Sequence, residues 1–159
     1  MTVVSDSSPI IALARVNKLH LFENLFGQVV IPDGVYKEIA IEGRPGAKEV
    51  SLGRIFKRET VKNPSAVLPI RERLGQADAE VIILAKEKKA DVILTNDRQL
   101  IKQAEAEKIP TITVLDILLQ AQKKGFLDRV QAVMDEMQRQ GVGIDEETYE
   151  ETLKLAGEK

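Results

Sequence analysis

The chain has 159 residues with 43% hydrophobic and 30% charged side chains, the composition of one ordinary soluble globular domain. It has no cysteine and only one histidine, His20. Disulfides, thiolate metal sites and histidine-rich zinc sites are therefore excluded. A metal ion would take oxygen ligands, as Mg²⁺ or Mn²⁺ does. The net charge of −2 gives no general attraction for nucleic acid, although a local basic patch would be enough to bind one. The 4% aromatic content argues against a base-stacking platform, so a nucleic acid would be held mainly by its phosphates.

The start of the chain predicts a short strand followed at once by a helix. Thr2 to Ser5 are β-branched or small. Ser8-Pro9 is typical of a helix start, with Ser8 as a hydroxyl N-cap and Pro9 at the first helical position. Asp6 therefore lies where a strand ends and a helix begins, the edge at which open parallel α/β sheets bind ligands. The alternative is that Asp6 only caps the turn.

Strand and helix patterns then alternate as far as a proline-containing linker. Residues 28–31, which end in three β-branched apolar residues, predict a second strand that stops at Pro32. Asp33 is placed to cap the helix that carries Glu38. The other expected segments are helices over 10–16 and 18–26, a loop over 43–46, a short helix over 47–52, an extended piece over 55–61 and a linker over 63–69.

The second half of the chain has the strongest helix pattern, over residues 71–88. Asp78 lies near its start, on one stripe with five apolar residues: Leu74, Ala77, Val81, Ile82 and Ala85. This register turns Asp78 towards the sheet and leaves Glu80 on a mixed face, solvated or in a supporting position. Strands over 91–95 and 109–114 and helices over 97–108, 116–124, 127–140 and 145–155 follow. The alternation predicts a parallel sheet of four to five strands sandwiched between helices.

Four acidic residues occupy comparable places at the predicted sheet edge: Asp6, Glu38, Asp78 and Asp97. Each alone is explained by a helix cap or a solvated helix face, but together they would repel one another unless cations neutralise them. One or two divalent ions, about 4 Å apart when there are two, would suit phosphodiester hydrolysis. Asp116 is either an N-cap or a further group at the rim. Four cations are either phosphate contacts or solvated charges: Arg15, Lys37, Arg98 and Lys102.

Four stretches carry these acids: Val3-Val4-Ser5-Asp6-Ser7-Ser8-Pro9, Ile31-Pro32-Asp33-Gly34-Val35-Tyr36-Lys37-Glu38-Ile39, Leu74-Gly75-Gln76-Ala77-Asp78-Ala79-Glu80-Val81-Ile82 and Asp91-Val92-Ile93-Leu94-Thr95-Asn96-Asp97. Taken in order, they resemble the PIN domain family of metal-dependent ribonucleases, close to the VapC-type toxins and an uncharacterised PIN-like branch of them. The likeness covers roughly residues 1–125, and residues 141–156 resemble the C-terminal helix of that branch.

The resemblance implies a PIN-like three-layer α/β/α sandwich over residues 1–125, with residues 126–159 as a helical extension packed on the same domain. Position by position, the acids match the family's metal-binding and catalytic residues: Asp6, Glu38, Asp78 and Asp97. Three residues fall at supporting polar positions: Ser8, Thr95 and Asn96. The resemblance also implies Mg²⁺ or Mn²⁺, RNA as the substrate and homodimers. One departure is Asp78 itself, where the branch more often has a glutamate, one methylene longer.

The leading hypothesis is a cytoplasmic Mg²⁺- or Mn²⁺-dependent endoribonuclease, the toxin half of a toxin–antitoxin pair with an antitoxin protein as its partner. Large apolar residues over 10–26 and 117–127 also favour a homodimer. No apolar run reaches the roughly 18 residues of a membrane span, and no signal peptide precedes Asp6, so we expect no membrane contact.

Two rival hypotheses belong to other classes. The first is a catalytically inactive PIN-like module that binds RNA or a protein. Mn²⁺-dependent RNA cleavage that a chelator abolishes would distinguish the enzyme from it. The second is a phospho-acceptor receiver domain, which also places acids at strand ends. That fold needs a lysine after its last strand, and residues 112–115 contain none.

Overall fold

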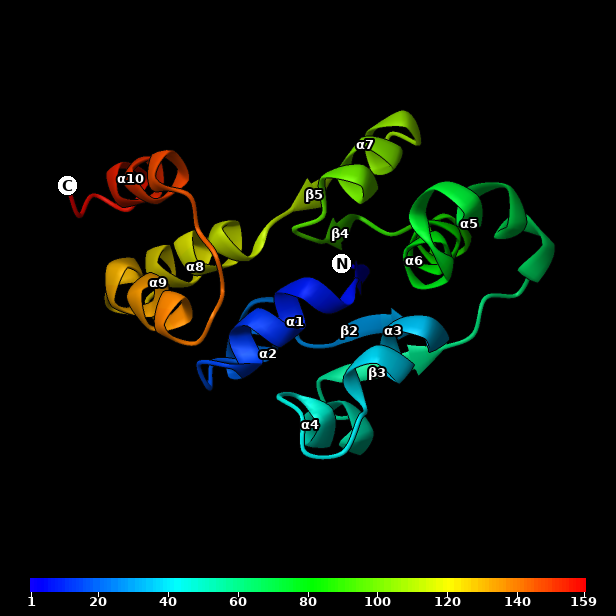
Figure 1. Ribbon diagram of the computed structural model, residues 1–159, viewed down its shortest axis with the longest axis horizontal. Helices are drawn as coiled ribbons and strands as arrows, with labels where there is room; N and C mark the ends of the chain where they lie inside the picture. The colour runs from blue at the N-terminus through cyan, green and yellow to red at the C-terminus, as the bar shows by residue number, and fades with distance from the viewer.

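Five short segments form one parallel sheet with helices around it in the computed structural model, which describes residues 1–159 (Figure 1). The strands are β1 (Val3–Ser5), β2 (Val29–Pro32), β3 (Phe56–Glu59), β4 (Val92–Leu94) and β5 (Thr111–Ile112). Their order in the sheet is β3-β2-β1-β4-β5. The parallel sheet and its flanking helices confirm the predicted three-layer α/β/α sandwich.

The centre of the sheet is β1, which is buried along its whole length. Val4 lies opposite Val30 of β2 on one side and opposite Ile93 of β4 on the other. The strand order therefore reverses between β1 and β4, and ligands of open α/β sheets bind outside the carboxyl ends of the strands at such a point. Asp6 follows β1 there, and Thr95 follows β4. The order also differs from the 2-1-3-4-5 order of receiver-type sheets.

Ten α-helices and one 3₁₀ turn connect and cover the strands. They are α1 (Ser7–Ala14), α2 (His20–Phe26), α3 (Asp33–Ile39), α4 (Ala47–Leu52), η1 (Pro64–Ala66), α5 (Leu68–Leu74), α6 (Gln76–Lys88), α7 (Arg98–Ala106), α8 (Val114–Lys123), α9 (Val130–Arg139) and α10 (Glu146–Leu155). Helix α6 packs on β1, β2 and β4, whereas α8 packs against α1, α2, α9 and α10 (Figure 1). No helix combines the length and apolarity needed to cross a membrane.

The prediction of one helix over residues 71–88 is wrong, because the chain forms α5 and α6 with a break at Gly75. Gly75 has φ 86° and ψ 166°, a conformation that glycine alone adopts readily. Asp78 consequently lies in the first turn of α6 rather than inside a longer helix, and Leu74 belongs to α5. The predicted stripe does not pass the break. Five consecutive residues of α6 are buried on all sides: Val81–Ala85.

Two helix caps also differ from the prediction. Helix α1 begins at Ser7 and its N-cap is Asp6, whose side chain accepts a hydrogen bond from the backbone N–H of Ser8 at 2.9 Å. Aspartate and serine cap helices about equally well, so the sequence did not decide between them. Helix α3 begins at Asp33 and has no side-chain cap. The Asp33 carboxylate instead accepts a hydrogen bond from Arg58 Nε at 2.7 Å.

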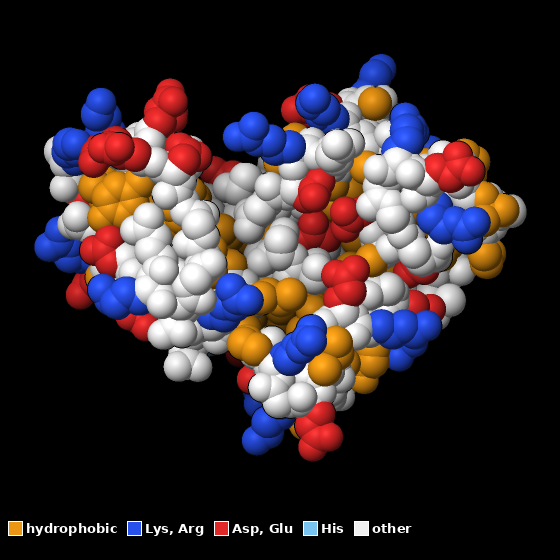
Figure 2. Space-filling view, viewed as in Figure 1, with side chains coloured by type: hydrophobic (Ala, Val, Ile, Leu, Met, Phe, Trp, Pro, Cys, Tyr) orange, Lys and Arg blue, Asp and Glu red, His pale blue; other side chains and the backbone are white.

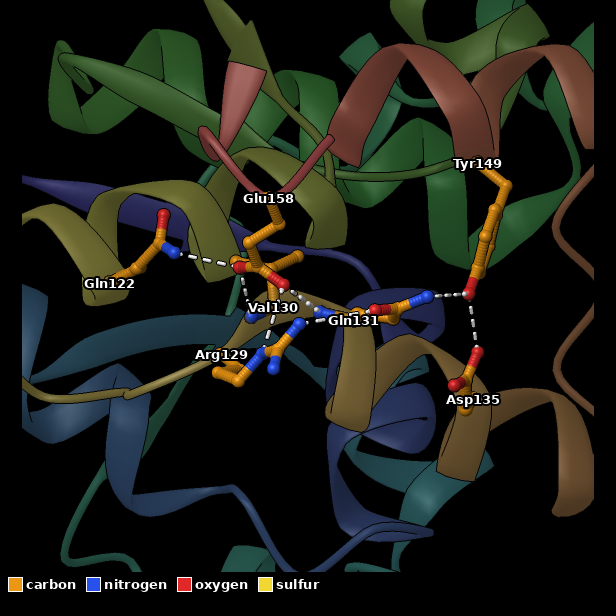
Figure 3. Close-up of polar contacts among 7 residues, drawn as sticks. All are labelled: Gln122, Arg129, Val130, Gln131, Asp135, Tyr149 and Glu158. Atoms are coloured by element: carbon orange, nitrogen blue, oxygen red, sulfur yellow. Dashed lines mark hydrogen bonds and ion pairs between the residues drawn. The ribbon is translucent and has the colours of Figure 1, made fainter. Parts of the chain in front are cut away.

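The C-terminal helices share the core of the sheet. Val130 and Met134 of α9 and Leu153 of α10 are buried in one cluster of 40 residues that includes the strands. Glu158, three residues after α10, adds polar contacts to α9 (Figure 3). Its carboxylate accepts hydrogen bonds from the backbone N–H groups of Val130 at 2.7 Å and Gln131 at 3.0 Å. These contacts hold the start of α9 against the end of the chain.

Candidate active site

Four carboxylates from four different elements line one pocket of about 230 Å³. Asp6 follows β1, Glu38 lies on α3, Asp78 lies in the first turn of α6, and Asp97 is the N-cap of α7. Figure 2 shows acidic side chains gathered near the middle of the molecule, with basic side chains around them. The remaining lining residues come from the start of α1 and the α5–α6 junction: Ser7, Ser8, Leu74, Gly75, Gln76 and Ala77. The structure thus brings together all four acids that the sequence singled out.

Asp6 is the most firmly held of these acids and is only 2% exposed. Its Oδ1 accepts hydrogen bonds from the backbone N–H and the hydroxyl of Ser8, at 2.9 and 2.8 Å. Its Oδ2 accepts one from the Thr95 hydroxyl at 2.5 Å. Burial, with a smaller contribution from the charge of Asp97, raises the pKa of Asp6 to about 6, although the hydrogen bonds oppose the shift. Asp6 therefore caps α1 and also lines the pocket.

Thr95 links Asp6 to Asp97 across the turn that follows β4. Its side chain is buried, and its hydroxyl donates to Asp6 while accepting a hydrogen bond from the backbone N–H of Asp97 at 3.0 Å. Asp97 itself is exposed, and its Oδ1 accepts a hydrogen bond from the backbone N–H of Leu100 at 2.9 Å. One hydroxyl thus fixes the positions of two pocket acids relative to each other.

Asn96 ties the same turn to two helix starts. Its backbone N–H donates to Ser8 Oγ at 3.2 Å, and its side-chain Oδ1 accepts a hydrogen bond from the backbone N–H of Val114 at 2.8 Å. Asn96 is not among the residues that line the acid pocket. Its contacts hold the β4–α7 turn against the first turns of α1 and α8.

Glu38 and Asp78 close the pocket from α3 and α6. Glu38 is exposed, and its Oε2 accepts a hydrogen bond from the Ser7 hydroxyl at 2.6 Å. Nothing in the sequence pattern indicated a role for Ser7, apart from its place next to Asp6. Asp78 is half-buried and has no hydrogen-bond partner in the chain. Burial, and then the charges of Asp6, Asp97 and Glu38, raise the pKa of Asp78 to about 7.

The pocket lacks balancing positive charge. None of its four carboxylates pairs with a lysine or arginine, because the ion pairs of the chain involve other acids. Oxygen ligands with uncompensated charge fit a hard divalent cation such as Mg²⁺ or Mn²⁺. In the structure, no group of three aspartate, glutamate or histidine side chains is already arranged to hold such an ion.

Other residues that the sequence suggested for the site lie outside the pocket. Asp116 is not the N-cap that the sequence suggested: Thr113 caps α8, and Asp116 completes a capping box with it from the third helical position. None of the four cations considered as phosphate contacts lines the pocket: Arg15, Lys37, Arg98 and Lys102. Glu80, which the sequence placed outside the site, does not line the pocket, and its carboxylate accepts a hydrogen bond from the backbone N–H of Gly34 at 2.7 Å.

A family model described as a PIN domain matches residues 2–158 of the chain. The matched range contains the whole sheet, the four carboxylates of the pocket and both C-terminal helices. No curated protein matches the sequence.

Proposed function

The chain belongs to the PIN domain family, whose members are generally nucleases, and we propose that it is an Mg²⁺- or Mn²⁺-dependent endoribonuclease that hydrolyses RNA phosphodiester bonds. The observation that carries the proposal is the single pocket lined by four carboxylates and by no lysine or arginine. Such a cluster favours divalent cations, because they relieve the mutual repulsion of its members. Divalent cations in turn suit phosphodiester hydrolysis.

The pocket residues have different parts in this proposal. Asp6 is the fixed ligand, because the hydroxyls of Ser8 and Thr95 hold its two oxygens in one orientation. The remaining ligands are the less restrained carboxylates: Glu38, Asp78 and Asp97. When bound, the metal would act as a Lewis acid that stabilises the charge on the attacking and leaving oxygens. The protein's own contribution is a rigid anchor on one side of the pocket and adjustable carboxylates on the other.

Cleavage of a single-stranded RNA with Mn²⁺ present tests the proposal. We expect cleavage by the parent protein, none after excess chelator, and none in Asp6→Asn, because a neutral amide is a poor ligand for a hard cation. Asp128→Asn is the matched control, since Asp128 is exposed and outside the pocket. Equal cleavage by the parent and by Asp6→Asn would reject the assigned site.

The alternative function is a PIN-like module that binds RNA or a protein without cutting it. Two observations favour it: no three acids stand ready-arranged for a metal, and Asp78 is a methylene shorter than the glutamate more often found there in the branch that the chain resembles. RNA binding in the presence of chelator, with no cleavage in either Mg²⁺ or Mn²⁺, would establish this alternative and reject the enzyme.

We further propose that the enzyme acts in the cytoplasm as the toxin of a toxin–antitoxin pair, with an antitoxin protein as its partner. The support is the resemblance to the VapC-type toxins. Expression of the parent protein should arrest growth, expression of Asp6→Asn should not, and the product of the neighbouring gene should relieve the arrest. Normal growth with the active parent enzyme would count against a toxin.

A homodimer remains a proposal that rests on the same resemblance. The large residues of the helices that suggested a dimer are mainly buried within one chain: Leu21, Phe22, Ile117 and Leu118. Light scattering at micromolar concentration should give twice the monomer mass of 17.7 kDa if the proposal is right. The monomer mass would refute it.

A further inference from the structure

Helices α3 and α6 touch at a point outside the proposed ligand set. Glu80 Oε1 accepts a hydrogen bond from the backbone N–H of Gly34 at 2.7 Å, and its Oε2 accepts one from the Gln76 side chain at 2.6 Å. A Cβ atom added to Gly34 would lie 2.8 Å from Ala77 Cα and 3.0 Å from Ala77 Cβ. The helices therefore approach at backbone distance, and a glycine at position 34 makes room for that approach.

The contact also provides a hydrogen-bond acceptor for a backbone N–H group in the first turn of α3. The N-cap of this helix, Pro32, has no side chain that could accept a hydrogen bond. The first N–H groups of a helix have no partner within the helix, so they need an acceptor from elsewhere. Glu80 supplies one of these acceptors from α6, 46 residues along the chain from Gly34.

The same contact lies beside two acids of the pocket. Gly34 and Glu38 are four residues apart on α3, so they share one face of that helix. Ala77 and Asp78 are neighbours in the first turn of α6, and Glu80 is two residues further on. The face of α3 that carries Glu38 is thus held against the turn that carries Asp78.

We propose that Glu80 is a positioning residue, which holds together the parts of α3 and α6 that carry Glu38 and Asp78, two of the carboxylates proposed to bind the cation. The inference rests on the proposed function. Glu80 is not itself a ligand, because it does not line the pocket and both its oxygens accept hydrogen bonds from Gly34 and Gln76. Without this contact the metal would have to organise the two helices as it binds, and its affinity would fall.

Mn²⁺ binding followed by the electron paramagnetic resonance of the free ion tests the proposal without any need for catalysis. Glu80→Ala should weaken Mn²⁺ binding about 10-fold or more, the usual effect of losing a group that supports metal ligands. Glu80→Gln keeps an acceptor oxygen for the Gly34 N–H, and the Gln76 amide can turn to match it, so binding should stay close to parental. Gly34→Ala should weaken binding as Glu80→Ala does, because its Cβ would press on Ala77.

Glu87→Ala is the matched control. Glu87 also lies on α6 and also accepts backbone hydrogen bonds, from Lys62 at 2.9 Å and Asn63 at 3.0 Å. It lies nine residues beyond Asp78, about 14 Å along the helix. Its loss should therefore leave Mn²⁺ affinity unchanged, and circular dichroism would verify that each variant is folded.

The outcomes separate the positioning role from the proposed function. A parent protein that binds no Mn²⁺ overturns both. A parent that binds Mn²⁺, with a folded Glu80→Ala that binds it equally well, overturns the positioning role alone. Loss in Glu80→Gln as large as in Glu80→Ala also overturns it, because the charge rather than the hydrogen bond would then matter. If Glu80→Ala does not fold, Glu80→Gln and Gly34→Ala decide: parental affinity in Gly34→Ala overturns the role.

Discussion

At the scale of single residues, Asp6 and Asp78 link the charge of the pocket to folding. Their pKa values rise from the ordinary 3.8 to about 6 and about 7 in the folded chain. At pH values between the ordinary pKa of 3.8 and the raised pKa of about 7, the folded state therefore binds more protons than the unfolded state. The contribution of both groups to the free energy of unfolding is complete below the ordinary pKa and is lost as the pH rises through the raised values. A bound divalent cation would take the place of the missing protons.

Urea unfolding at a series of pH values, with chelator present, measures this effect. The free energy of unfolding should fall between about pH 5 and about pH 8 in the parent, and the fall should be smaller in Asp78→Asn, whose amide does not titrate. Mn²⁺ should stabilise the parent most at the alkaline end, where both carboxylates are charged. Asp128→Asn, outside the pocket, should keep the parental slope. A level or rising free energy of unfolding in the parent would contradict the raised pKa values.

At the scale of the elements, the break between α5 and α6 shapes one wall of the pocket. Gly75 ends α5 and precedes α6, and the residues on either side of it line the pocket. No atom lies within 4 Å of a Cβ added at Gly75, so a side chain there would meet no obstacle. The cost of replacing this glycine is therefore the backbone conformation alone, φ 86° and ψ 166°.

Gly75→Ala should accordingly lower the free energy of unfolding by about 1–3 kcal/mol, as measured by urea unfolding in chelator. Gly143→Ala is the matched control, because Gly143 also has open space at its Cβ and does not have a positive φ. Its stability should change little. Parental stability in Gly75→Ala would mean that the chain can break its helix here in another way.

Local sequence patterns predicted most of the helices and strands. The structure differs from the prediction where two local patterns compete, or where a contact joins residues far apart in the sequence. The helix over 47–52 has the predicted bounds because glycines enclose it on both sides. The helix over 71–88 was predicted without its break because the apolar spacing continues across Gly75 and one glycine costs a helix only about 1 kcal/mol. The four acids could be predicted to share an edge because parallel strands end together. The contact between Glu80 and Gly34 could not, since it joins helices that only the fold brings together.

At the scale of the whole molecule, a single carboxylate completes the attachment of the C-terminal helices. Helix α9 has neither a side-chain cap from Arg129 nor an acidic residue in its first turn. Glu158 supplies the missing acceptor, with Oε2 bound to the N–H of Val130 and Oε1 to that of Gln131 (Figure 3). The Gln122 side chain of α8 donates to the same carboxylate at 2.7 Å. Only 8% of the Glu158 side chain is exposed, and Arg129 Nε lies 3.7 Å from its Oε1, so the carboxylate is held at the helix start by both hydrogen bonds and an ion pair.

Glu158→Ala should therefore lower the free energy of unfolding by about 2 kcal/mol, because it leaves helix N–H groups without their acceptor. The melting temperature should fall by about 4–8 °C. Glu158→Gln keeps one acceptor oxygen and should lose roughly half as much, whereas Glu151→Ala, on the exposed side of α10, should lose little. Since Glu158 does not line the acid pocket, Mn²⁺ binding by the folded variant should equal that of the parent. A parental melting temperature in Glu158→Ala would mean that water accepts the hydrogen bonds of the first N–H groups of α9, and that apolar packing alone holds the C-terminal helices.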